Sequence, residues 1–340
     1  MIISNFPQVV QKHLGHLAKD DYPELDTFKF VSIWLSLVLD QSQTSMRSQF
    51  KRLNVRGERV DISTFSKASK KRNPKTFKEI WEKLKQEVEV SRKQETRELV
   101  LFPLDSTVIS LTSKLLWRQG HHQVKLFSGI NLDTGAPGGI VINFGQGHDS
   151  KYGNETIEAT PENGVGIMDR GFCSLERIAK LQEEKERYFV LRIKSNISLN
   201  MLDNGKYEIG TGKEKIEGRV VVFSDREERT EFRLATNLPE EGEGGISNEE
   251  IGKFYRLRWQ IELLWKFLKM HLKLDRLITK NTNGIEIQIY CCLIGYLILR
   301  LVRIPKEFGE SLLDKLRYLQ AFMCEKISYV HWLRELVVSC

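Results

Sequence analysis

The chain has 340 residues, of which 41% are hydrophobic and 29% are charged, a composition that excludes a disordered or fibrous protein. The five cysteines form no CxxC pair and show no metal-ligand spacing, so we expect reduced thiols in a cytosol. No signal-peptide pattern opens the chain. The longest apolar run, Ile289 to Leu299, is shorter than the ~20 residues of a membrane span and predicts a buried helix.

The positive charge is concentrated in one segment. The formal net charge is +7, and the stretch from Arg47 to Lys78 holds eleven Lys or Arg against two acids, whereas the rest of the chain is close to neutral. Such a segment is typical of a module that binds a polyanion. A solvated charged face would have the same composition, so charge alone leaves both interpretations open.

The first third of the chain has helical periodicity. Residues 26–42 are apolar at nearly every helical position, and residues 63–71 can form a short helix. Asn73 and Pro74 then supply an N-cap and a first-turn residue for an amphipathic helix that ends at about Ser91. Helices with a basic turn between them predict a helix-turn-helix-like DNA-binding head.

From Leu99 the pattern changes to alternating strands and helices. Leu99 to Asp105 and Val165 to Asp169 both predict strands that end in an aspartate. Strands are also expected at 124–132, 139–144 and 188–193, and helices at 152–159 and 174–185. The order predicts an α/β core with a mixed sheet.

A β-rich stretch separates this core from the last major helix. Strands are expected at 207–211, 216–223 and 231–236. Ser247 and Glu250 then form a capping box that opens a long helix to about Leu272.

Three acids stand out by position. Asp105 and Asp169 lie at predicted strand ends, where open α/β sheets place their ligands, and Glu262 lies within the long helix. Cleavage of a phosphodiester by two metal ions needs carboxylates, which are the ligands that Mg²⁺ prefers. A single aspartate at a strand end is more often structural or solvated.

The predicted helix carries a polar stripe at spacings of three, four and seven residues. The stripe consists of Tyr255, Arg258, Glu262 and Lys269, and it lies beside a largely apolar face. Cations on it could hold a DNA phosphate beside a metal-bound Glu262. An amphipathic helix with an Arg258–Glu262 ion pair would show the same spacing.

These residues resemble the Tyr-(2)-Arg-(3)-Glu-(6)-Lys motif of DDE transposases, of the insertion-sequence-four type found in bacterial mobile elements. The run YRLRWQIELLWKFLK matches that motif, and LDST at Leu104–Thr107 and MDRGF at Met168–Phe172 resemble the two aspartate motifs. LRIKSN at Leu191–Asn196 and LATNL at Leu234–Leu238 are also similar to the family. The likeness covers roughly residues 97–275.

The resemblance implies an RNase H-like fold with a mixed-sheet core, interrupted by a small β-rich insertion and preceded by an all-helical N-terminal domain. It implies Asp105, Asp169 and Glu262 as catalytic ligands of two Mg²⁺ ions, for which Mn²⁺ is expected to substitute. It implies contacts to DNA from Tyr255, Arg258 and Lys269, with Arg170 a further candidate.

The implied activity is cut-and-paste transposition. The enzyme would bind the terminal inverted repeats of its own element, cleave them and join the freed 3′-OH ends to target DNA, as a homodimer in the DNA complex. The expected location is the bacterial cytoplasm, in association with the nucleoid and away from the membrane. The expected domains are a helical DNA-binding domain at 1–96, catalytic core at 97–196, β-rich insertion at 197–245, catalytic core with the Glu262 helix at 246–310 and a helical tail at 311–340.

Related enzymes can use a tryptophan of the insertion to stack a flipped base, whereas residues 197–245 here hold only Tyr207, Phe223 and Phe232 as aromatic residues. Two other functions remain open. One is an inactive transposase remnant that binds DNA as an inhibitor or regulator, and the other is a different RNase H-like nuclease, such as a junction resolvase. The intact set of acids and the Tyr-Arg-Glu-Lys spacing favour the active transposase.

Overall fold

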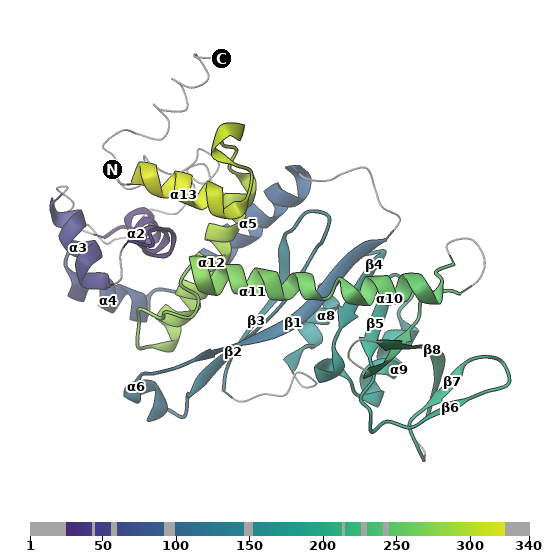
Figure 1. The fold of residues 1–340 in the computed structure, drawn as a ribbon. Helices are drawn as coiled ribbons and strands as arrows, with labels where there is room; N and C mark the ends of the chain where they lie inside the picture. The colour runs from purple at the N-terminus through teal and green to yellow at the C-terminus, as the bar shows by residue number, and fades with distance from the viewer. Residues whose placement is uncertain are drawn as a thin grey trace. The chain divides into compact units, whose positions relative to one another are not determined.

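The computed structural model describes residues 25–42, 45–55, 60–91, 99–145, 152–212, 215–225, 230–240 and 245–323. The parts of the predicted 1–96 and 311–340 domains beyond these ranges lie outside the described residues. Backbone contacts divide the chain into two compact units (Figure 1). One unit is formed within residues 1–91, 110–122 and 266–340, and the other within 92–109 and 123–265. We call them the helical unit and the sheet unit.

The helical unit is organised around one apolar helix. Its described helices are α2 (Thr27–Leu39), α3 (Met46–Val55), α4 (Ile62–Lys71), α5 (Lys75–Ser91), α6 (Lys114–Trp117), α12 (Thr282–Leu301), the short η3 (Lys306–Phe308) and α13 (Leu312–Met323). Helix α12 packs against α2, α4, α5 and α13. It is long and apolar enough to cross a membrane, but 83% of its apolar window is buried in this unit, which confirms the predicted buried helix.

Within the described residues, the sheet unit holds one mixed sheet of nine strands in the order β3-β2-β1-β4-β5-β9-β8-β7-β6. The strands are β1 (Val100–Ser110), β2 (Gln123–Ile130), β3 (Pro137–Phe144), β4 (Gly164–Met168), β5 (Tyr188–Arg192), β6 (Leu199–Met201), β7 (Tyr207–Ile209), β8 (Ile216–Asp225) and β9 (Thr230–Thr236). The pairs β1–β4 and β4–β5 are parallel, whereas β5–β9, β9–β8, β8–β7, β7–β6 and β2–β3 are antiparallel. The α/β class and the mixed sheet are therefore confirmed.

The described helices of this unit are α8 (Asn154–Glu158), the short η2 (Arg170–Phe172), α9 (Leu175–Glu183), α10 (Asn248–Arg256) and the first half of α11 (Trp259–His271). Helix α10 packs on β4, β5 and β8. Helix α8 packs on β2 and β3, and α9 packs on β8.

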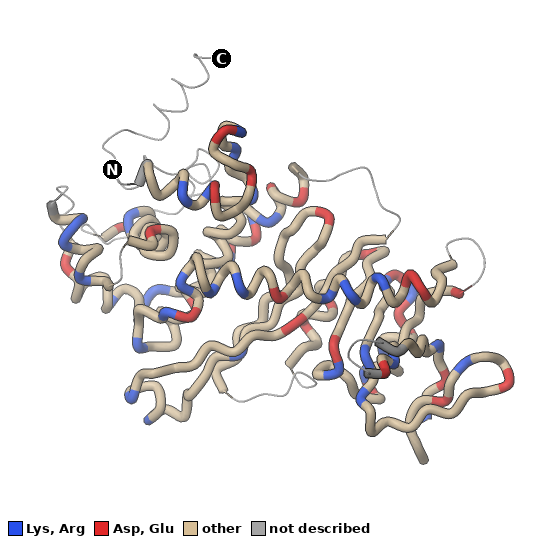
Figure 2. The backbone as a smooth tube through the Cα atoms, in the orientation of Figure 1, with Lys and Arg blue, Asp and Glu red and all other residues tan. Residues whose placement is uncertain are grey.

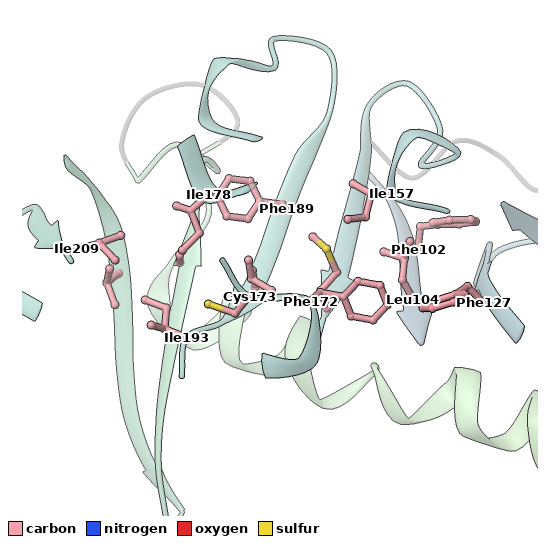
Figure 3. Close-up of a cluster of buried hydrophobic side chains, with 14 residues drawn as sticks. Phe102, Leu104, Phe127, Ile157, Phe172, Cys173, Ile178, Phe189, Ile193 and Ile209 are labelled. Atoms are coloured by element: carbon pink, nitrogen blue, oxygen red, sulfur yellow. The ribbon is translucent and has the colours of Figure 1, made fainter. Parts of the chain in front are cut away.

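Alternation along the strands gives the sheet two buried faces. Phe102, Leu104 and Met168 belong to a cluster that also contains Phe172 and Ile178 of the η2–α9 region (Figure 3). Leu101 of β1 and Val165 and Ile167 of β4 belong to a second cluster with Ile251 and Tyr255 of α10. Because successive side chains of a strand point to opposite faces, every other residue of β1 and β4 faces α10.

Two predicted elements were wrong in their bounds. The strand expected to end at Asp105 continues to Ser110, because Thr107 and Ile109 are buried beyond it. The single helix expected from Ser247 to Leu272 is divided into α10 and α11 by a turn at Leu257 and Arg258.

Candidate active site

The register of the parallel strands brings Asp105 and Asp169 together. Leu101 lies opposite Val165, and Pro103 opposite Ile167. If this register continues for two more residues, Asp105 lies opposite Asp169. Since Leu101, Val165 and Ile167 belong to the cluster on the α10 face, the strand period of two predicts that both aspartates face α10. Asp169 directly follows β4, as predicted, and its side chain accepts a 2.7 Å hydrogen bond from the Gly171 N–H.

Glu262 reaches this face from the first turn of α11. The predicted capping box is confirmed, because Ser247 and Glu250 cap the start of α10 reciprocally. At the other end of α10, the N–H of Arg258 donates to the Tyr255 carbonyl and the N–H of Ile261 to the Arg258 carbonyl, three residues back in each case. This tightened turn interrupts the helix just before Glu262, so Arg258 lies in the turn and not within a continuous helix.

Negative charge accumulates around Asp105. Burial, with smaller contributions from the charges of Asp169 and Glu262, raises the pKa of Asp105 from 3.8 to about 6, while a hydrogen bond from the Ser106 N–H and the charge of Arg258 oppose the rise. The effects of Asp169 and Glu262 on Asp105 indicate that the three predicted acids lie near one another in the sheet unit.

Arg258 is the cation at the centre of this group. Its Nη2 donates to Glu262 Oε1 at 2.6 Å, with side-chain exposures of 20% and 31%. Burial alone would lower the pKa of Arg258, but the hydrogen bond to Glu262 and the nearby Asp105 raise it. The ion pair expected for a simple amphipathic helix is therefore present. It coexists with the acid group, because Glu262 also acts on Asp105.

Arg192 is a site residue that the sequence did not single out. It is the last residue of β5. Leu191 lies opposite Met168 of β4, so the next residue of each chain segment brings Arg192 beside Asp169. Its guanidinium lies 4.2 Å from the centre of the Phe232 ring and hydrogen-bonds the Tyr255 side chain. Burial raises the pKa of Tyr255, and Asp169 raises it further. Arg192 and Arg258 therefore act on the same buried tyrosine.

The structure says less about the other residues that were predicted to contact DNA. Arg170 is exposed in η2, beside Asp169. Lys269 lies in the part of α11 that belongs to the helical unit, so its place at the acids stays a prediction. Trp259, at the start of α11, is 57% exposed three residues before Glu262, whereas Phe223 and Phe232 of the insertion stack on each other at 5.1 Å.

The acids suit a divalent cation by their chemistry, since carboxylate oxygens are hard ligands. Burial disfavours the charged form of Asp105 and raises its pKa, and a bound cation would offset that cost. Within the described residues, no three His, Cys, Asp or Glu side chains lie close enough together to hold a metal ion. Glu262 instead pairs with Arg258, so the carboxylates would have to draw closer around a cation.

A sheet that carries two aspartates on neighbouring parallel strands, with a glutamate on a covering helix, is the arrangement that the motif resemblance implies. Comparison with known proteins agrees: residues 97–298 match the family model for the transposase DDE domain. The chain belongs to this family of DDE transposases.

Individual relatives are transposases of insertion sequences. The chain is 67% identical, over 99% of its length and 100% of the relative's, to the "Putative transposase for insertion sequence element IS4SA" of Synechocystis sp.. It is 28% identical, over 61% of its length and 59% of the relative's, to the "Probable transposase for insertion sequence element IS5377" of Geobacillus stearothermophilus. A 79-residue stretch, 23% of the chain and 20% of the relative, is 39% identical to the "Transposase for insertion sequence element IS421" of Escherichia coli.

Proposed function

We propose that this transposase cuts the ends of its own insertion sequence and joins them to target DNA, with Asp105, Asp169 and Glu262 as the catalytic acids. The observation that carries the proposal is the electrostatic grouping of the three acids. Strand register sets the two aspartates side by side, and the charges of Asp169 and Glu262 both raise the pKa of Asp105.

Asp105, Asp169 and Glu262 would hold two Mg²⁺ ions, for which Mn²⁺ would substitute. When bound, such ions activate the attacking oxygen and stabilise the leaving oxygen of a phosphoryl transfer. The chain's own contribution is to hold the carboxylates on the rigid strands β1 and β4 and on α11. Because burial disfavours the charged form of Asp105, its ionisation would be linked to the binding of a cation.

The cations around the acids would position the DNA backbone. Arg258 presents a planar fork of N–H donors, one of which already donates to Glu262, and the fork suits a phosphate. Tyr255 is buried between Arg192 and Arg258, so its hydroxyl would be held in one orientation beside the strand being cut. Lys269 and the exposed Arg170 would add phosphate contacts.

The domain assignment belongs to the same proposal. Residues 97–196 and 246–310 would form an RNase H-like core, and residues 197–245 a β-rich insertion, although β8 and β9 pair within the main sheet. Residues 1–96 would bind the terminal repeats, and 311–340 would form a helical tail.

The basic segment supports DNA binding by the N-terminal helices. The exposed cations of α3 and α4 are Arg47, Lys51, Lys67, Lys70 and Lys71, and no acid lies within either helix (Figure 2). Such a surface favours a polyanion over a purely solvated face. Two copies would pair the two ends of the element in the bacterial cytoplasm, at the nucleoid.

The alternative is a catalytically inactive remnant that binds the ends as an inhibitor or regulator. Cleavage of DNA that carries the gene's own flanking ends separates the two, by comparing the wild-type protein with Glu262→Gln, in Mg²⁺ and in EDTA. We expect Mg²⁺-dependent cutting by the wild type alone and equal binding of the ends by both proteins. If both bind and neither cuts, the regulator is the correct function.

A further inference from the structure

The turn that joins β1 to β2 exposes two large apolar side chains. Residues 111–122, which we call the α6 tip, contain the four-residue helix α6, where Leu115 is 56% exposed and Trp117 is 44% exposed. Most apolar side chains of this size in the described residues are buried. The tip is therefore a place where the fold leaves an aromatic and an aliphatic side chain exposed to solvent.

This exposure is built into an ordered turn. Leu111 and Leu116 of the tip are almost fully buried. The Leu111 N–H donates to the His122 carbonyl at 2.9 Å, and the Trp117 indole N–H donates to the Leu111 carbonyl. Gly120 ends the helical turn with a φ of 81°, a conformation that glycine adopts readily. Trp117 is thus fixed by its indole nitrogen and not left on a loose loop.

The charged side chains of the tip are cations, and no acid lies among its residues. The exposed Lys114 and Arg118 are four residues apart, on one side of the helical turn that also carries the two apolar side chains. Between Ser106 and Leu132 the sequence contains no Asp or Glu, so no acid of this stretch neutralises them. Figure 2 shows basic and no acidic positions at α6. Cations beside an exposed tryptophan are the combination that binds nucleic acid through phosphates and base faces.

We propose that the α6 tip binds DNA where a base is unpaired or a base step is open, with Lys114 and Arg118 on phosphates and Trp117 stacked on the base. Fully paired duplex hides its base faces, so the indole adds affinity only for opened DNA. This inference rests on the proposed function to the extent that the protein acts on DNA, but it assigns a surface that the acids do not include.

A second copy of the chain fits the tip less well. Two like-charged tips would repel each other, and two exposed side chains offer far less area than the ~1,200 Å² or more that a stable interface buries. The acid-free stretch favours a polyanion over a protein partner of ordinary composition.

The test is the binding of two synthetic duplexes unrelated to the element's ends, one fully paired and one with a short unpaired bubble, measured by fluorescence anisotropy. We expect wild-type protein to prefer the bubble and Trp117→Ala to lose about 5- to 100-fold in affinity for the bubble, with little change for paired duplex. Tyr152→Ala, which removes an aromatic side chain that is 42% exposed, is the matched control and should bind like wild type.

Further variants keep the test independent of folding and of catalysis. Trp117→Phe keeps a ring without the indole hydrogen bond and should retain most of the preference for the bubble. Lys114→Gln and Arg118→Gln should weaken binding of both duplexes and each reduce the salt dependence by about one phosphate contact. The proposal would be overturned if the folded Trp117→Ala variant bound the bubble duplex with wild-type affinity. It would also be overturned if the variant changed its oligomeric state while its affinity for DNA stayed the same. Cleavage of the element's ends by wild type, assayed in parallel, reports separately on the proposed function.

Discussion

Removing the charge of Asp105 should stabilise the protein while it abolishes cleavage. Burial, together with the neighbouring acids, raises the pKa of Asp105 from 3.8 to about 6. At 1.36 kcal/mol for each pH unit, folding the ionised carboxylate costs about 3 kcal/mol relative to an ordinary aspartate. Asp105→Asn keeps the shape and an oxygen for the Ser106 N–H but carries no charge. We therefore expect its free energy of unfolding to exceed that of wild type by up to about 3 kcal/mol.

The sign of this effect fixes its pH dependence. Below about pH 4 the carboxyl is protonated in both the folded and the unfolded chain, so the variant has no advantage. The advantage grows between about pH 4 and pH 6 and is complete above about pH 7, where wild-type Asp105 must ionise in the fold. Thermal or urea unfolding in EDTA, at several pH values, measures the difference without a metal ion to offset the charge.

The exposed Asp203→Asn is the matched control, and it should show no such pH-dependent gain. If Asp105→Asn is no more stable than wild type at about pH 7.5, then the charge of Asp105 is not disfavoured in the folded protein. Burial of Asp105 beside the other two acids would then be contradicted. Adding Mg²⁺ should narrow the difference, because a bound cation stabilises wild type and not the variant.

Three further perturbations test the surroundings of the acids. Arg258→Gln removes a cation that lowers the pKa of Asp105, so the acid limb of the pH–rate profile for cleavage should move to higher pH. Arg219→Gln should lower the free energy of unfolding by at least about 2 kcal/mol and speed hydrogen exchange in α10, because Arg219 donates to the Leu238, Pro239 and Ile246 carbonyls before that helix. Trp259→Ala removes an exposed indole beside Glu262 and should slow end cleavage more than it weakens duplex binding; equal effects on both would contradict a role at the cut end.

Local patterns in the sequence predicted much of this sheet. Alternation and turn residues located β2 to β5 and β7 to β9 within a few residues, and the capping box at Ser247 marked the start of α10 correctly. The aspartates could be found because each lies on or directly after an apolar strand. The continuation of β1 beyond Asp105 was also visible in principle, since Thr107, Val108 and Ile109 are β-branched and alternate in burial.

Other features depend on contacts between distant residues. No proline or glycine marks the turn between α10 and α11, so helical periodicity alone predicted one continuous helix. The pairing of β9 with β5 places Leu234 opposite Arg192, and no local pattern reports a pairing over such a separation. For that reason the contacts of Arg192 with Phe232 and Tyr255 could be recognised only from the sheet register.

We propose that Asp105, Asp169 and Glu262 hold the metal ions of a DNA-cutting site. The most direct test is a crystal structure of the protein with its element's end DNA and Mn²⁺, in which anomalous scattering locates the ions. We predict Mn²⁺ between these three carboxylates, with Glu262 drawn away from Arg258 and Arg258 on a phosphate. Mn²⁺ bound elsewhere, with the Arg258–Glu262 pair intact beside the DNA, would contradict the account.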